Sequence, residues 1–151
     1  MRLMGLDVGD KTVGVAVSDE LGITAHPVTV IRRTGSIKKE AAEILRLAQE
    51  YNVERIVVGR PLMMDGTPGV QAEKVDFFVE ALRRRTHIPI VEWDERLSTS
   101  EAERMLIEAD QSRSKRREII DKVAAAVILD SYMRSQSGIK SIQDEDSHSD
   151  D

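Results

Sequence analysis

The sequence predicts an α/β fold in which a mixed β-sheet is covered by helices. Residues 1–32 hold three short apolar runs with short polar links between them, which is typical of an antiparallel meander. Two more apolar runs each follow a helical pattern, and a strand reached through a helix is usually parallel to its neighbour. The order is therefore three strands, helix, strand, helix, strand and further helices.

Each expected strand is a short run rich in β-branched residues and bounded by turn-forming residues. The second run shows the pattern most clearly, because Val13, Val15 and Val17 alternate with Gly14 and Ala16. The five predicted strands are Met1–Val8, Thr12–Ser18, Ala25–Arg32, Arg55–Gly59 and Ile88–Trp93.

Four helices are predicted from apolar periodicity and from capping residues. Thr67 reads as an N-cap with Pro68 at the first helical position, and Ser98 and Glu101 form a capping box. The predicted helices run from Ser36 to about Tyr51, from Thr67-Pro68 to about Arg85, from Ser98 to about Ala109, and over Glu118–Met133, with a basic linker at Gln111–Arg117 before the last.

Length and composition exclude several classes of protein. A chain of 151 residues is enough for one domain with a real core. The absence of Cys excludes disulfides, Cys-based zinc sites and thiol nucleophiles. No apolar run approaches the ~20 residues of a membrane span, and the N-terminus runs straight into a strand without a signal-peptide pattern. We therefore expect a soluble, cytoplasmic protein without a membrane partner.

The acidic net charge is concentrated at the C-terminus. The formal charge is -5, and Ser137–Asp151 holds one Lys against five Asp or Glu, a net of -4, which leaves -1 for the rest. We expect a domain over 1–136 and a disordered tail over 137–151. The tail is either a solubilising end or a competitor with nucleic acid for a basic face. With only five aromatic residues, a base-stacking platform is not expected.

Acidic residues stand at three places where they could meet at one edge of the sheet. Asp7 interrupts the first apolar strand, Asp94 and Glu95 follow the last strand directly, and Asp121 falls on the apolar side of the final helix. Each has a purely structural alternative: Asp7 capping its Gly-rich turn, Asp94 as a turn residue, and Asp121 as a helix-dipole carboxylate.

A converging cluster of carboxylates would repel itself unless cations filled it. Hard oxygen ligands without His or Cys suit Mg²⁺ or Mn²⁺. Two such ions ~3.5–4 Å apart would activate a water and stabilise the leaving oxygen in phosphodiester hydrolysis. The histidines His26, His87 and His148 are too scattered in the sequence to indicate a zinc site.

Basic residues gather near the same positions. They are either a solvated charge run or a track for a phosphate backbone. They comprise Lys11, Arg60, Arg96, Arg113, Lys115, Arg116 and Arg117.

Four blocks of the chain, read together, resemble the YqgF/RuvX family of pre-16S rRNA nucleases, which are related to Holliday junction resolvases. They span about residues 2–134 in the family's order. The blocks are Gly5-Leu6-Asp7-Val8-Gly9 continuing to Gly14-Val15-Ala16-Val17-Ser18-Asp19, Val58-Gly59 with Pro61-Leu62 and Met64-Asp65-Gly66-Thr67, Asp94-Glu95-Arg96-Leu97-Ser98-Thr99, and Asp121 followed by Ala124-Ala125-Ala126.

The resemblance implies an RNase H-like fold, with strand order 3-2-1-4-5 and helices on both faces. It also implies a metal-dependent nuclease in 5′-end maturation of pre-16S rRNA, with Asp7, Glu95 and Asp121 as metal-binding acids and Asp94 as the alternative to Glu95. Adjacent residues of an extended segment point to opposite sides, so only one of Asp94 and Glu95 can face Asp7. Lys11, Arg60, Arg96 and Thr99 would line the substrate site. The chain departs from the family pattern at Asp10, Thr12 and Arg60.

Other functions remain open at this point. The nuclease could act on RNA, including ribosomal precursor particles, or resolve branched DNA, as a monomer or a homodimer. The turn after Asp7 also resembles the phosphate loop of sugar kinases and actin-like ATPases, which need two such domains. A third alternative is a non-catalytic, RNA-binding ribosome-assembly factor.

Overall fold

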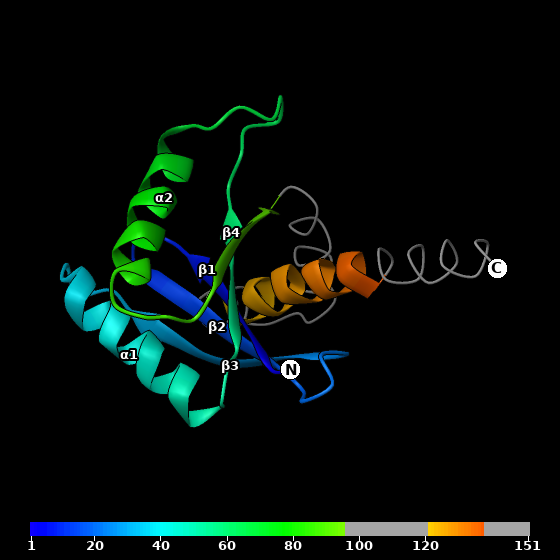
Figure 1. The fold of residues 1–151 in the computed structure, drawn as a ribbon. Helices are drawn as coiled ribbons and strands as arrows, with labels where there is room; N and C mark the ends of the chain where they lie inside the picture. The colour runs from blue at the N-terminus through cyan, green and yellow to red at the C-terminus, as the bar shows by residue number, and fades with distance from the viewer. Residues whose placement is uncertain (96–120, 138–151) are drawn as a thin grey trace, which may run out of the picture.

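The computed structural model describes residues 1–95 and 121–137, and it shows a five-stranded sheet of order β3-β2-β1-β4-β5 (Figure 1). β1 pairs antiparallel with β2 and parallel with β4, β2 pairs antiparallel with β3, and β4 pairs parallel with β5. This confirms the predicted mixed sheet and its order. The strands are β1 Leu3–Val8, β2 Thr12–Ser18, β3 Ala25–Arg32, β4 Arg55–Arg60 and β5 Ile90–Asp94.

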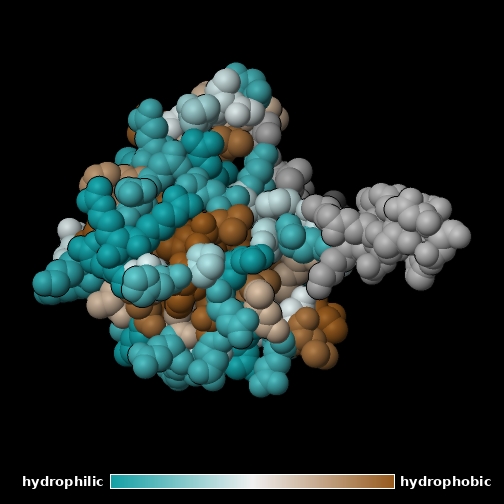
Figure 2. All heavy atoms as spheres, viewed as in Figure 1, coloured by the Kyte–Doolittle hydropathy of each residue, from teal (hydrophilic) through white to brown (hydrophobic). Residues whose placement is uncertain are grey.

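Helices cover both faces of this sheet, as expected. The helices α1 (Ile37–Glu50) and α2 (Val70–Arg83) lie on one face, and residues 121–137 form a helix on the other (Figure 1). Hydrophilic residues predominate over the outer surfaces of α1 and α2, and apolar residues show where they meet the sheet (Figure 2). None of the helices in the described ranges has the length and apolar character that a membrane span needs.

Side chains of β1 alternate between the two faces of the sheet and pack into two separate cores. Met4, Leu6 and Val8 pack in the larger core with α1 and α2, whereas Leu3 packs with the helix of residues 121–137. Because successive side chains of a strand point to opposite faces, Asp7 lies on the same face as Leu3. We call this face, which carries the helix of residues 121–137, the acidic face.

Two glycines let that helix lie almost in contact with the strand backbones. A Cβ at Gly5 would lie 2.7 Å from the carbonyl oxygen of Ala125, and one at Gly14 would collide with the backbone carbonyl of Asp121. No side chain fits in either place, since real Cβ atoms essentially never approach within 3.0 Å of another heavy atom. The pair therefore fixes how close Asp121 comes to the sheet.

The start of α2 differs from the prediction. The helix begins at Val70 after an N-cap at Gly69 that makes no side-chain capping bond, not at Thr67-Pro68. The Asp65 carboxylate accepts hydrogen bonds from both the backbone N–H and the hydroxyl of Thr67, and Pro68 bridges to Leu62. These local bonds hold the segment in an extended turn, which is why the capping signal fails there.

The remaining boundaries agree more closely. α1 begins beside Ser36, as predicted, and the Ser36 side chain caps it by accepting a bond from the Lys39 N–H. The apolar side chains of α2 at Val75, Phe78, Val79 and Leu82 are buried. α2 ends at Arg83 and β5 begins at Ile90, each two residues from the predicted boundary. The predicted helix over Ser98–Ala109, the linker Gln111–Arg117, the start of the helix at Glu118 and nearly all of the tail 137–151 lie outside the described residues.

A buried ion pair supports the turn that follows Asp7. Glu40 of α1 has only 1% of its side chain exposed and accepts a bond of 3.0 Å from Arg33. The same Arg33 donates to the carbonyl of Gly9 at 3.0 Å and lies over the ring of Phe78 in α2, 5.1 Å from its centre. The β1–β2 turn is thereby tied to both α1 and α2.

Candidate active site

Asp7 lies near the carboxyl end of β1, the middle strand of the sheet. Its Cα partner on β2 is Gly14, so no side chain covers it from that strand. Burial raises the pKa of the Asp7 carboxyl, and the nearby charge of Asp121 raises it further, although a hydrogen bond with Glu95 opposes the rise. Asp7 is therefore a partly buried acid that faces two other carboxyl groups.

Glu95 directly follows β5 and reaches Asp7 from the neighbouring side. A Cβ at Gly59 of β4 would lie 2.8 Å from the Glu95 side chain, so the absence of a side chain at Gly59 makes the space for it. Burial, the hydrogen bond with Asp7 and the charges of Asp7 and Asp94 raise the pKa of Glu95 to about 9. At neutral pH, Glu95 is protonated and donates this hydrogen bond to the Asp7 carboxylate.

Asp121 approaches from the helix on the acidic face. The Thr12 hydroxyl on β2 donates a hydrogen bond of 2.8 Å to its carboxylate. This contact confirms that the side chain leans towards the sheet, and the effect of its charge on Asp7 places the two acids near each other. Carboxyl groups from three separate elements thus approach one another at one edge of the sheet.

Asp94 does not join them. Its register partner on β4 is Arg60, and its side chain lines an open pocket of about 460 Å³ with Arg60, Leu62, Asp76, Glu92 and Trp93. Of the two adjacent acids that the sequence left as alternatives, the structure therefore brings Glu95 to Asp7.

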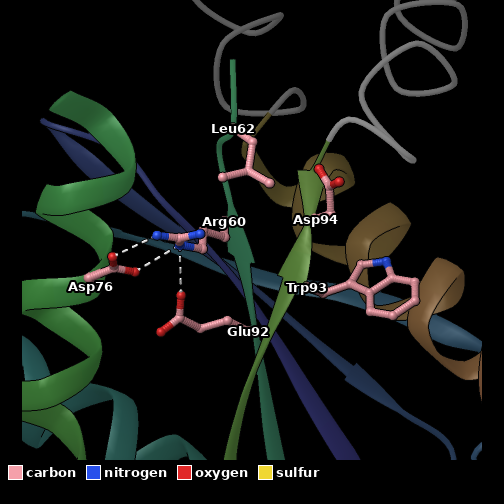
Figure 3. A pocket seen from close by; sticks show the side chains of 6 residues that line it. All are labelled: Arg60, Leu62, Asp76, Glu92, Trp93 and Asp94. Carbon is pink, nitrogen blue, oxygen red and sulfur yellow. Dashed lines mark hydrogen bonds and ion pairs between the residues drawn. The ribbon is translucent and has the colours of Figure 1, made fainter. Parts of the chain in front are cut away.

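Arg60 lies on the opposite face of the sheet from Asp7. Its guanidinium makes two hydrogen bonds of 3.0 Å to Asp76 of α2 and an ion pair of 3.2 Å to Glu92 of β5 (Figure 3). Trp93 points the other way in the same view, towards the helix of residues 121–137, where its indole N–H donates to Ser131. The resemblance implied that Arg60 lines the substrate site. The structure instead pairs Arg60 with Asp76 and Glu92, away from the three acids.

The donor set fits a hard divalent cation. Asp7, Glu95 and Asp121 offer only carboxylate oxygens, the ligands that Mg²⁺ and Mn²⁺ prefer. Within residues 1–95 and 121–137, no three such side chains are close enough to form a ready metal site. In this arrangement Asp7 and Glu95 share a proton in their hydrogen bond, and Thr12 holds Asp121. A cation would replace that proton and neutralise the repelling charges.

The other predicted residues divide into two groups. Lys11 is exposed in the β1–β2 turn, beside the acids in the chain. The remaining predicted contacts lie outside the described residues; they are Arg96, Thr99, Arg113, Lys115, Arg116 and Arg117.

Two supporting residues were missed by the sequence interpretation. Thr12 holds Asp121, and Gly59 makes room for Glu95. The sequence offered a sign of the role of Gly59. A Gly at the end of an apolar strand such as Ile56-Val57-Val58 often marks a place where another part of the chain comes close to the strand backbone. The sequence offered no such sign for Thr12, since its partner is 109 residues away.

Known proteins resemble this chain along most of its length. Residues 1–135 match the family described as "RuvX: Holliday junction resolvase". Curated relatives named "Putative pre-16S rRNA nuclease" include those of Desulforamulus reducens (56% identical, 89% of this chain and 98% of the relative), Thermoanaerobacter pseudethanolicus (54%, 90% and 98%) and Listeria innocua (54%, 88% and 97%).

Solved structures confirm the fold at much lower identity. RuvC of Thermus thermophilus, in complex with a Holliday junction substrate, is 16% identical with a TM-score of 0.57, covering 89% of this chain and 96% of its own. The yeast mitochondrial Holliday junction resolvase Ydc2 is 13% identical with a TM-score of 0.55, and the match covers 91% of this chain and 80% of Ydc2. The fold is thus RNase H-like, and the match over residues 1–135 shows that the chain belongs to the RuvX (YqgF) family of nucleases.

Proposed function

We propose that this protein is a metal-dependent nuclease that hydrolyses phosphodiester bonds in pre-16S rRNA, in maturation of its 5′ end. The meeting of Asp7, Glu95 and Asp121 at one edge of the sheet is the observation that carries this proposal. The names of relatives that share about half of the sequence supply the substrate. A protein that only bound RNA would gain nothing from a cluster of acids that repels phosphate.

The three acids have separate roles in this proposal. Asp7, at the centre, would bridge two Mg²⁺ or Mn²⁺ ions, and Glu95 and Asp121 would each hold one. Such ions lower the pKa of a bound water and stabilise the leaving oxygen in phosphodiester hydrolysis. Glu95 would release its proton to become a ligand, and the Thr12 hydroxyl would hold Asp121 in place.

The test is cleavage of a pre-16S rRNA fragment with Mg²⁺ or Mn²⁺, with product ends mapped to single nucleotides. We expect Asp7→Asn to lower the rate by about 10²–10³-fold, the usual cost of removing a group that stabilises transition-state charge. The exposed Glu73→Gln removes the same charge on α2 and serves as the matched control. Cleavage by Asp7→Asn at the wild-type rate would contradict the proposal.

Resolution of branched DNA is the second candidate, because the family description names a Holliday junction resolvase. Paired cuts in a four-way junction would require a homodimer. A parallel assay on such a junction, with the same two variants, distinguishes the substrates. Metal-dependent cutting of the junction but not of the RNA would replace our proposal with this one.

A further inference from the structure

Most cationic side chains of the described residues already have a partner. Arg33 is paired with Glu40, Arg60 with Asp76 and Glu92, and Lys74 with Asp10. Within residues 1–95 and 121–137, the Lys and Arg side chains without a hydrogen bond or ion pair are Lys11, Arg32, Lys38, Lys39 and Lys122. Unpaired cations are the ones free to bind an anionic ligand.

Arg32 lies beside Thr12 on the acidic face. The two residues are Cα partners in the β2–β3 ladder, and directly opposite residues of an antiparallel pair project to the same face. The Thr12 hydroxyl binds the Asp121 carboxylate on that face. The exposed Arg32 side chain is therefore an immediate neighbour of the Thr12–Asp121 pair.

Lys122 lies on the flank of its helix that faces β2 and β3. At about 100° per residue, positions 122 and 131 fall on opposite sides of a helix. Ser131 contacts Trp93 of β5, so Lys122 lies on the flank away from β5. Together with Lys11 in the β1–β2 turn, these residues place free positive charge on the β2–β3 side of the three acids.

The β4–β5 side offers no unpaired cation among the described residues. Arg60 is neutralised there by Asp76 and Glu92, and Asp94 lines the same pocket (Figure 3). Arg60 lies on the opposite face of the sheet from the acids, and its two carboxylate partners leave no net positive charge for a phosphate. Within residues 1–95 and 121–137, the unpaired cations nearest the acids therefore lie on the β2–β3 side.

We propose that the phosphodiester backbone of the substrate leaves the acids across the end of β2 and β3, with phosphates bound by Arg32 and Lys122. An Arg fork matches the geometry of phosphate oxygens, and Lys adds a point charge. This inference rests on the proposed nuclease function and adds two binding residues and a direction to it. Lys11 lies near the start of this path, whereas Arg60 is excluded from it.

The test measures binding without cleavage. Fluorescence anisotropy follows a labelled RNA spanning the 5′ end of pre-16S rRNA, with Ca²⁺ in place of Mg²⁺, over a series of salt concentrations. Each phosphate contact on a single strand contributes about 0.7 to the slope of log K against log[salt], so the double variant Arg32→Gln/Lys122→Gln should lower the slope by about 1.4. Lys38→Gln/Lys39→Gln, which removes two exposed and unpaired cations of α1 on the other face, is the matched control.

Each outcome separates this inference from the proposed function. A double variant that binds with the wild-type affinity and slope overturns the inference, whether or not the wild type cleaves RNA. A slope that falls equally in Lys38→Gln/Lys39→Gln also overturns it, since the effect would then be one of net charge. A wild type that binds the RNA without cleaving it in Mg²⁺ overturns the proposed function alone. A parallel series with a four-way DNA junction shows which nucleic acid uses the path.

Discussion

At the scale of single residues, the site holds a proton where a cation is expected to bind. Glu95 donates this proton to Asp7, and its pKa of about 9 lies far above the ordinary value of 4.5. Between these two pH values, the folded protein keeps a proton that the unfolded chain has released. Linkage then requires that the stability contributed by this group is fully present below pH 4.5 and is lost as the pH rises towards 9.

The pH dependence of stability therefore reports on this pair. In EDTA, we expect the free energy of unfolding to fall between pH 5 and pH 9 by up to about 1.4 kcal/mol per pH unit. Glu95→Gln should remove most of this fall and be more stable than the wild type at pH 8.5, while losing activity. Urea titrations across the pH range measure the effect.

The exposed Glu73→Gln again serves as the matched control, and it should keep the wild-type dependence. Saturating Mg²⁺ should flatten the wild-type curve, because a cation would replace the shared proton. Equal slopes in Glu95→Gln and the wild type would show that the two carboxyl groups do not share a proton.

Thr12 acts at the same scale, as a positioning residue for Asp121. Thr12→Val keeps the side-chain volume and removes the 2.8 Å hydrogen bond. We expect kcat to fall by about 10–100-fold, the usual effect of losing a residue that orients a metal ligand, with KM nearly unchanged. Stability should change by only about 1 kcal/mol, as for one hydrogen bond.

The conservative variant distinguishes positioning from general structure. Thr12→Ser keeps the hydroxyl and should restore most of kcat, whereas a purely structural role would depend on the methyl group as well. Single-turnover rates and thermal melts of the two variants give the comparison. A serine variant as slow as the valine variant would argue against the role of the hydroxyl.

These residues also show which parts of the site the sequence can reveal. Asp7 stands out because it interrupts an apolar strand, and such a carboxylate needs a reason. The choice between Asp94 and Glu95 depends on which face of β5 meets the helix of residues 121–137, and the mixed side chains of β5 do not fix this. Arg60 binds Asp76 because of the way α2 is oriented against the sheet. That orientation depends on tertiary packing, so the sequence alone does not reveal the contact.

At the scale of elements, the approach of the final helix to β2 decides where Asp121 lies. The contact depends on Gly14, whose missing side chain admits the backbone of Asp121. We expect Gly14→Ala to lower the free energy of unfolding by about 3 kcal/mol through overpacking, and to lower activity by displacing Asp121. Chemical denaturation and the cleavage rate measure the two effects.

Gly35→Ala separates this clash from ordinary glycine strain. Gly35 has a φ of +84° and nothing within 4 Å of an added Cβ, so its substitution should cost only about 1 kcal/mol and leave activity unchanged. Equal losses of stability in the two variants would contradict the account of helix packing.

The elements themselves were largely predictable, for identifiable reasons. β2 and β3 have the predicted bounds, because β-branched residues lie between clear turn signals. α1 begins where Ser36 caps it. α2 begins late because Asp65 captures the Thr67 N–H, and this competition between a turn and a cap cannot be judged from propensity alone.

At the scale of the whole molecule, charge is distributed unevenly along the chain. Residues 137–151 carry -4 of the formal -5, and the family match ends at residue 135. The relatives align over 97–98% of their own length and over 88–90% of this chain. The family match therefore covers residues 1–135 and does not extend into the acidic segment 137–151.

We expect a chain ending at residue 136 to keep the melting temperature and the cleavage rate of the full chain, because the described side chains that form the site on the acidic face all precede that point. Its affinity for RNA should also stay the same if the tail only adds solubility. A rise in affinity at low salt that disappears at ~1 M salt, where the Debye length is ~3 Å, would show instead that the tail competes with RNA for a basic face. Anisotropy titrations of both chains at several salt concentrations, with Arg32→Gln/Lys122→Gln in each, decide between these outcomes. If the tail competes for the path across β2 and β3, the double variant should abolish the gain from truncation.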